Sequence, residues 1–289
     1  MTSSTAGTLP AYWQLMRLNR PIGTLLLLWP TLWSLWLAAK GVPEWHILLI
    51  FIAGVAIMRA AGCVINDYAD RNIDGHVERT RQRPLVSGAV SPGGALALFA
   101  ILCLLAFGLV LMTNPLTIKL SVGGLRLAFC YPFMNRFTCL PHLLLVAVFA
   151  WSIPMAYTAQ LGQLNADIWL IYITVVIWTV VYDTFYAMVD RNDDIKIGVK
   201  SSAILFGEHD RLITAVLQML VVGCLLIVGQ KFHMGLYYYI GVAVASLLFF
   251  YQQYLIRDRR RQECFKAFLN NNWVGCSIFL GIAVDYAAS

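Results

Sequence analysis

Charged residues are scarce in this chain of 289 residues: only 12% are Asp, Glu, Lys or Arg, whereas 60% are hydrophobic. A soluble protein of this length could not bury so much apolar surface, so the composition excludes an ordinary soluble protein. The seven cysteines show no Cys-x-x-Cys spacing, and we interpret most of them as small buried hydrophobic residues. The N-terminus lacks a signal-peptide pattern, and no nucleic-acid-binding module is recognisable. We therefore expect no nucleic-acid partner, and no obligate protein partner is evident.

Long apolar segments recur along the chain. Each has about 20 residues, the length that crosses a hydrocarbon core of roughly 30 Å. They predict an all-α polytopic membrane protein, a single domain over 1–289 with about nine transmembrane helices. The candidate spans are 22–39, 45–65, 94–113, 116–134, 140–160, 166–187, 211–229, 235–255 and 271–288. Pro30 and Pro154 fall inside two of these spans and predict kinks.

The basic residues predict the orientation in the bilayer. Most of the 21 Lys and Arg residues fall in alternate connecting segments, on the side that also holds the N-terminus. Because basic loops stay cytoplasmic, we expect the N-terminus in the cytoplasm and the C-terminus on the far side. In a bacterium this membrane would be the inner membrane.

Two acidic motifs follow apolar runs. Asn66, Asp70 and Asp74 are four residues apart, a spacing that places side chains on one face of a helix. The pentad that begins at Asp70 returns 120 residues later as Asp190-Arg-Asn-Asp-Asp194. The echo suggests pseudo-repeats over about 20–135 and 140–255, with a last helix at 271–288, and one site built from both halves.

Crowded carboxylates repel one another unless a cation lies among them, and hard divalent cations prefer oxygen ligands. Mg²⁺ keeps waters and binds substrate phosphates, so the motifs predict a Mg²⁺ bridge to a diphosphate. Asp67 and Asp193 lie off the shared face and are weaker candidates. The predicted ligands are Asn66, Asp70, Asp74, Asp190 and Asp194.

Basic residues flank these motifs more closely than an orientation signal requires. Arg79 and Arg83 follow the first motif, and Lys196 follows the second. Arginine forks stabilise the charge that develops on a departing diphosphate. Arg59 lies inside an apolar run, where a charge is costly, and shares the Asn66 face about two turns deeper. We expect it to hold the carboxylate of a second substrate.

A few further side chains could line the reaction cavity. Tyr131 and Tyr186 could face an apolar cavity or a carbocation through their π-faces. Asp183 precedes Asp190 by one heptad and could bind a substrate hydroxyl or support a ligand. Most of the other aromatic residues are expected in interface belts or in packing.

The chain resembles the UbiA-type membrane prenyltransferases. The resemblance rests on NDYADRNID, DRNDD, LMRLNRPIGTLLLLWPTLW and YPFMNR, and extends through RAAGCVINDYAD, SIPMAY, KSSAILFG and NNNWVG. It implies nine helices around a central cavity that opens laterally to lipid. Within the family it is nearest to bacterial enzymes of ubiquinone synthesis, which implies polyprenyl diphosphate and 4-hydroxybenzoate as substrates and Mg²⁺ as cofactor.

The resemblance also assigns individual residues. The metal-binding motifs of the family fall on Asn66, Asp70, Asp74, Asp190 and Asp194. Its diphosphate-contacting residues fall on Arg17, Arg79 and Arg83, and its carboxylate-binding arginine falls on Arg59. The family often has Lys where this chain has Asn135, so we expect the neighbouring Arg136 to supply that charge.

Other function classes remain open from the sequence. A secondary transporter also carries intramembrane charges, but its site would lie near the midplane rather than at span ends. A CDP-alcohol phosphotransferase also uses an Asp cluster, but the rest of its spacing is absent. Within the family, haem, quinone-naphthoate and chlorophyll acceptors are alternatives to 4-hydroxybenzoate.

Overall fold

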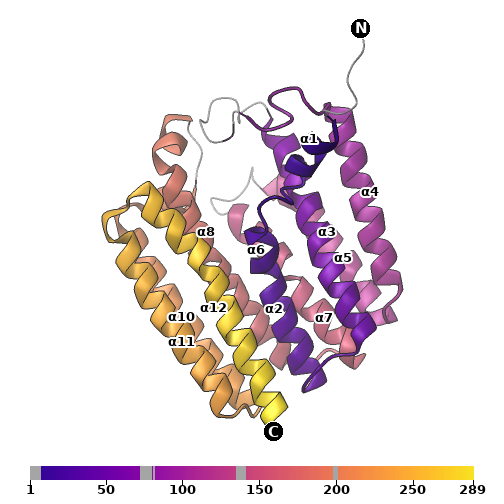
Figure 1. Cartoon of the computed structure of the whole chain (residues 1–289), viewed down its shortest axis with the longest axis vertical. Coiled ribbons are helices and arrows are strands. Elements are labelled where there is room, and N and C mark those ends of the chain that lie inside the picture. The colour runs from indigo at the N-terminus through magenta and orange to yellow at the C-terminus, as the bar shows by residue number, and fades with distance from the viewer. Residues whose placement is uncertain (1–7, 72–79, 81, 135–140, 198–200) are drawn as a thin grey trace. The chain divides into compact units, whose positions relative to one another are not determined.

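The computed structural model describes residues 8–71, 80, 82–134, 141–197 and 201–289, which contain helices and no strand. This confirms the all-α prediction. The helices, drawn in Figure 1, are α1 (Thr8–Leu15), α2 (Ile22–Ala39), α3 (Trp45–Asp70), α4 (Pro92–Leu111), α5 (Pro115–Met134), α6 (Pro141–Ala150), α7 (Ser152–Leu161), α8 (Asp167–Ile197), α9 (Ser202–Phe206), α10 (Asp210–Lys231), α11 (Leu236–Leu255) and α12 (Arg261–Ala288).

Seven helices in the described part are long and apolar enough to cross a membrane: α2, α3, α4, α8, α10, α11 and α12. The chain is therefore a polytopic membrane protein, as predicted. A shorter apolar stretch covers 146–161, on α6 and α7. Each of the nine predicted spans falls on a helix or on this broken pair, but a count of nine crossings stays a prediction.

The predicted kink at Pro154 takes the form of a break between α6 and α7. Trp151 interrupts the helix, and its N–H donates to the carbonyl of Val148 at 3.1 Å in a tight turn. Ser152 then begins α7, so Pro154 occupies the first turn of a new helix. Because first-turn N–H groups have no intrahelical acceptor, proline is tolerated there.

Two compact units are distinguished by their internal contacts. Unit 1 comprises residues 1–25 and 49–112, and unit 2 comprises 26–48 and 113–289. These units follow packing and not sequence similarity, so the predicted pseudo-repeats stay a prediction.

In unit 1, small side chains let helices pack closely. Ala60, Ala61 and Val64 of α3 form a buried cluster with Leu15 of α1 and Ala95 of α4. The cluster fixes α1 against the part of α3 that leads to the first acidic motif.

In unit 2, α11 and α12 pack backbone to backbone. A Cβ on Gly241 would lie 2.6 Å from the Ser277 carbonyl oxygen and 3.2 Å from the Gly281 Cα. Small residues allow this approach in membrane helices, where van der Waals packing drives association. At the far end of α12, the Asp285 carboxylate accepts the Gly235 N–H at 2.6 Å and so satisfies the start of α11.

Three consecutive asparagines join α12 to three other helices of unit 2. Asn270 accepts from Gln252 of α11 at 2.9 Å. Asn271 accepts from the indole of Trp178 of α8 at 2.8 Å, and Asn272 accepts from Trp29 of α2 at 2.9 Å. Successive residues point about 100° apart on a helix, which is why neighbours can reach three partners.

Candidate functional site

The first acidic motif lies at the C-terminal end of α3. Asn66 is half-buried, Asp70 is exposed, and both lie on the last turns of the helix. The negative end of a helix dipole disfavours a carboxylate by itself and favours a cation beside it. Because α3 ends at Asp70, the helical-face argument covers only these two residues. Asp74 and Arg79 lie outside the described residues, so their roles stay predictions.

Asp67 is the anchor of two of the predicted diphosphate-binding arginines. Its side chain is only 2% exposed, and the Nη2 of Arg17 donates to Oδ1 at 2.9 Å. The Nη1 of Arg83 lies 3.0 Å from the same oxygen. Arg17 adopts a left-handed backbone conformation with φ of 54° between α1 and α2. The buried carboxylate therefore holds two cations together next to Asn66, a role that local spacing did not reveal.

Arg59 is placed against the backbone at the start of α2. A Cβ built on Gly23 would lie 2.4 Å from its Nε and 2.8 Å from its Cζ, so the guanidinium occupies space that any side chain at residue 23 would fill. Arg59 is half-buried and precedes Asn66 by seven residues, about 10 Å along the helix. The predicted depth below the acidic motif is thus retained.

The second acidic motif lies on the last turns of α8. Asp190 is 9% exposed, Asp194 follows one turn later and is half-buried, and Lys196 is exposed. Asp193 belongs to a different face and accepts from Nη2 of Arg261 at 2.5 Å. As in the first motif, the acidic residue off the shared face pairs with arginine.

The structure describes only some of the side chains that were predicted to line the reaction cavity. Tyr186 packs against Phe268 of α12, with ring centroids 4.9 Å apart. Asp183 lies half-buried two turns before Asp190 on α8. Arg136 lies outside the described residues, and so does the side chain of Tyr131; the roles of all four predicted residues stay predictions.

Comparison with known proteins identifies the family. The model of the UbiA prenyltransferase family matches residues 27–275. The chain belongs to the UbiA prenyltransferase family. Among similar proteins, the 4-hydroxybenzoate octaprenyltransferase of Saccharophagus degradans is 61% identical over 96% of this chain and 93% of its own. That of Vibrio campbellii is 56% identical, over 96% of this chain and 97% of its own.

Solved structures of UbiA proteins share the fold. A UbiA homologue from Aeropyrum pernix, in its apo form, matches with a TM-score of 0.78 and 26% identity, over 91% of this chain and 97% of its own. A homologue from Archaeoglobus fulgidus bound to GPP and Mg²⁺ matches with a TM-score of 0.71 and 16% identity, over 96% of this chain and all of its own. The nearness of such folds agrees with the helical membrane architecture described above.

The donor set of this UbiA prenyltransferase fits a hard divalent cation. Within the described ranges, no three His, Cys, Asp or Glu side chains gather closely enough to hold a metal ion. The described motifs instead offer oxygen ligands in small numbers: Asn66 and Asp70 on α3, and Asp190 and Asp194 on α8. One or two carboxylates completed by phosphate and water form the usual magnesium site in phosphate-handling enzymes.

Proposed function

We propose that this protein transfers a polyprenyl group from polyprenyl diphosphate to the ring carbon ortho to the hydroxyl of 4-hydroxybenzoate, in ubiquinone biosynthesis. The observation that carries the proposal is the nearly full-length similarity, at 56–61% identity, to proteins named 4-hydroxybenzoate octaprenyltransferase. The names also suggest an eight-unit donor. The donor tail is apolar and fits a membrane-embedded enzyme.

The diphosphate end of the donor binds at the acidic motifs. Asn66, Asp70 and Asp74 would hold one Mg²⁺, and Asp190 and Asp194 would hold another. When bound, the metal neutralises the diphosphate and the charge that grows on it as the C–O bond breaks. Arg17 and Arg83 donate N–H groups to the oxygens of the diphosphate. The contact of both arginines with Asp67 supports their positions. Arg79, Arg136 and Lys196 add positive charge.

The acceptor binds deeper along α3. Arg59 forms a charge-assisted pair with the carboxylate of 4-hydroxybenzoate and so turns its ring toward the donor. The C–O bond of the donor breaks, diphosphate leaves with the bonding electrons, and the ortho carbon forms a C–C bond to the allylic cation. The ring then loses its proton and regains aromaticity. Tyr131, Asp183 and Tyr186 line the acceptor end.

The membrane position completes the proposal. We place the protein in the bacterial inner membrane, with the N-terminus and both acidic motifs on the cytoplasmic side, as the basic residues predict. The apolar tail of the donor then stays in the bilayer while its charged end meets the cytoplasm.

Product analysis by mass spectrometry tests the reaction. The protein is expressed in a host that lacks its own enzyme. Membranes from this host are then incubated with 4-hydroxybenzoate, Mg²⁺ and a mixture of prenyl diphosphates. We expect a prenylated 4-hydroxybenzoate whose mass reports the chain length. If no such product forms while another aromatic acceptor, supplied in a parallel reaction, is prenylated, the assigned acceptor is wrong.

A further inference from the structure

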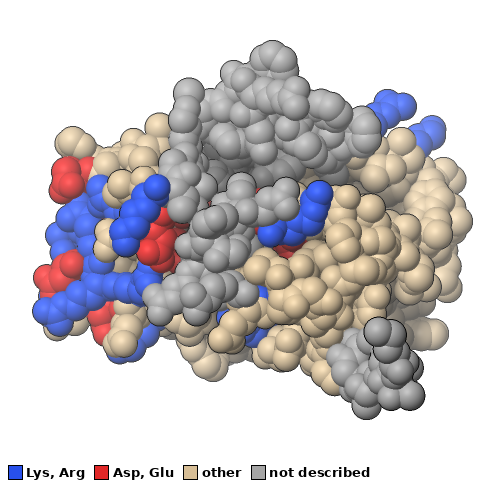
Figure 2. All heavy atoms as spheres, turned by 90° about the horizontal axis from the view of Figure 1, so that it is seen from above, with Lys and Arg blue, Asp and Glu red and all other residues tan. Residues whose placement is uncertain are grey.

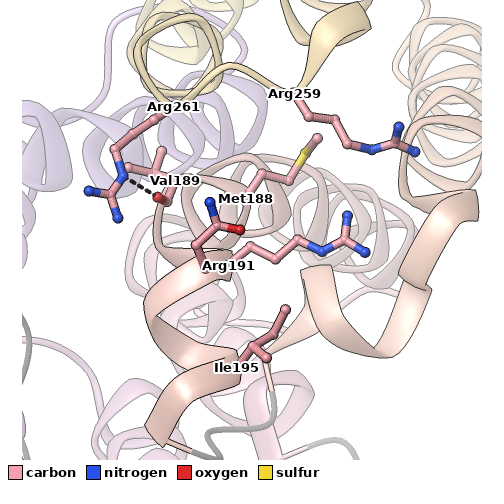
Figure 3. Close-up of a pocket in the computed structure, with 7 residues that line it drawn as sticks. Met188, Val189, Arg191, Ile195, Arg259 and Arg261 are labelled. Carbon is pink, nitrogen blue, oxygen red and sulfur yellow. Dashed lines mark hydrogen bonds between the residues drawn. The ribbon is translucent and has the colours of Figure 1, made fainter.

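A pocket lies beside the last turns of α8, and Arg259 and Arg261 reach it from the start of α12 and the residues before it (Figure 3). Its volume is about 330 Å³, and it lies entirely within unit 2. Three of the seven lining residues are arginines and none is acidic. The lining residues are Met188, Val189, Arg191, Asn192, Ile195, Arg259 and Arg261.

The pocket is separate from the proposed metal site although both use α8. Met188, Asn192 and Ile195 recur at helical spacing and define one face. Asp190 and Asp194 fall nearly half a turn away around the same helix, at about 100° per residue. A ligand in the pocket would therefore not compete for the carboxylates of the motif.

One buried acid, Asp210, and the exposed Glu208 pair with two of the pocket arginines, Arg191 and Arg259. Asp210 is fully buried and receives a bidentate pair from Arg259, with Nη2 to Oδ1 at 2.8 Å and Nε to Oδ2 at 3.0 Å. Arg191 donates its Nη1 to the same carboxylate at 3.4 Å. The hydrogen bond to Asp210 raises the pKa of Arg259. The bidentate pair preorganises the Arg259 guanidinium, and its Nη1 N–H groups are not used by these bonds.

Arg261 completes the arginine set from the first turn of α12. Its Nε donates to the Val189 carbonyl at 2.7 Å and its Nη2 to Asp193, which leaves its Nη1 for a ligand. In Figure 3 its side chain reaches Val189 from the opposite side of the pocket to Arg259. Arg259 and Arg261 thus each present unused guanidinium N–H groups, one arginine on each side of the pocket. Such planar donors suit the oxygens of a phosphate.

The surroundings of the pocket suit the phosphate of a lipid better than a free phosphate. Ile195 is 61% exposed at the pocket, and Leu212, near the start of neighbouring α10, is 63% exposed. At the end of α11, the Arg257 guanidinium lies 3.9 Å from the ring centroid of exposed Tyr254, a pairing typical of the lipid–water boundary. Figure 2 shows Lys and Arg side chains gathered at this end among Asp and Glu. A free phosphate would need the arginines but no apolar rim.

We propose that this pocket binds the phosphate headgroup of an anionic membrane lipid. Basic pockets between membrane helices are suited to such headgroups, since charge and apolar contact act on the same molecule. The lipid would tie α8 to the α11–α12 connection, beside the helix turns that carry the second acidic motif.

Lipid titration of the purified, delipidated full-length protein tests the proposal. Thermal unfolding and native mass spectrometry are followed with phosphatidylglycerol, phosphatidylcholine or inorganic phosphate. The test variant is Asn192→Asp, which adds a negative charge to the pocket at unchanged side-chain size. Its matched control is Asn165→Asp, the same change at an exposed asparagine before the other end of α8.

We expect phosphatidylglycerol to bind the wild-type protein and the control about tenfold more tightly than it binds Asn192→Asp. Phosphatidylcholine and inorganic phosphate should bind weakly to all three. Equal phosphatidylglycerol affinity of Asn192→Asp and the control would overturn the site. Equal binding of phosphatidylcholine would overturn the charge requirement, and a phosphate response as large as that of the lipid would overturn the lipid assignment. If Asn192→Asp unfolds early without lipid, Ile195→Glu at the exposed rim replaces it with the same expectation.

Discussion

Arg17 and Asp67 form a 2.9 Å hydrogen-bonded ion pair across 50 residues of sequence, and Arg83 shares the same carboxylate oxygen at 3.0 Å. The two arginines bring their positive charge to one buried carboxylate. That charge lies beside Asn66, where the proposed function requires a diphosphate. We therefore expect Asp67 to act through the arginines that it positions.

The substitution Asp67→Asn tests this positioning role. An amide side chain keeps the shape of the carboxylate but loses the charge that aligns both arginines. We expect the affinity for prenyl diphosphate to fall about tenfold and the free energy of unfolding to fall by about 1–3 kcal/mol. The KM for 4-hydroxybenzoate should change little. Steady-state kinetics with each substrate varied separately gives the answer, and an increase confined to the 4-hydroxybenzoate KM would contradict the assignment.

The metal-binding role predicts a sharper loss. Asp190→Ala or Asp70→Ala should abolish transfer, because removal of one carboxylate leaves the diphosphate charge poorly compensated. Asp167→Ala, at the half-buried start of the same helix α8, is the matched control and should stay active. Chelation by EDTA should stop the wild-type enzyme, and added Mg²⁺ should restore it. Turnover of Asp190→Ala near the control rate, at equal protein in the membrane, would exclude the role.

The contact between Gly23 and Arg59 gives a test of acceptor recognition. Gly23→Ala places a methyl group where the guanidinium lies, so Arg59 must move while its charge is kept. We expect the KM for 4-hydroxybenzoate to rise by about tenfold, since a charge-assisted bond is worth about 1.5–3 kcal/mol. Gly54→Ala, on α3 with open space around its Cβ position, is the matched control.

A double-mutant cycle separates this effect from a general disturbance of α2. In an Arg59→Met background, which itself should raise the same KM strongly, Gly23→Ala should have no further effect. If both backgrounds lose the same amount, the methyl group acts through something other than Arg59. An effect on the prenyl diphosphate KM alone would require the two substrates to be placed afresh.

Stability should depend on the asparagine series of α12. Asn271 is fully buried and accepts from Trp178, so Asn271→Ala would leave the indole N–H without this partner. We expect a loss of about 1–2 kcal/mol, measured as a lower midpoint of thermal unfolding in detergent. Trp178→Phe removes the donor, and in that background the loss at Asn271 should shrink. Additive losses would show that the bond contributes little.

Topology can be tested by labelling with a membrane-impermeant thiol reagent. Gln82→Cys reports on the segment after the first acidic motif, and Glu44→Cys reports on the connection between α2 and α3. Both native side chains are exposed. In spheroplasts we expect rapid labelling at residue 44 and labelling at residue 82 only after the membrane is opened. The reverse pattern would invert the proposed orientation.

Apolar periodicity predicted where the helices lie but not where they end. The span predicted to end at residue 65 continues to Asp70, the span predicted to end at 187 continues to Ile197, and the span predicted to begin at 271 begins at Arg261. Hydropathy marks the part of a helix that meets lipid, whereas the backbone hydrogen bonds continue into water. The described residues of both acidic motifs lie on the polar extensions of α3 and α8.

The placement of the candidate site residues was predictable where it depends on local spacing and hidden where it depends on distant pairing. Asn66 with Asp70 and Asp190 with Asp194 follow from positions four apart on a helix. The role of Asp67 could not be read this way, because Arg17 approaches it only when α1 packs on α3. The sequence shows Asp67 between Arg17 and Arg83, but it does not tell which of the charged residues meet in the folded chain.

The length of α8 has a consequence for how the substrate is divided between two solvents. Its 31 residues extend about 46 Å, whereas the hydrocarbon core is only about 30 Å thick. Because the polar residues of α8 gather at its C-terminal end, we expect the last turns, with Asp190 and Asp194, to stand beyond the lipid tails. A prenyl diphosphate can then keep its apolar chain in the bilayer while its C–O bond breaks at the aqueous boundary. The reaction therefore never requires a diphosphate to dissolve in hydrocarbon.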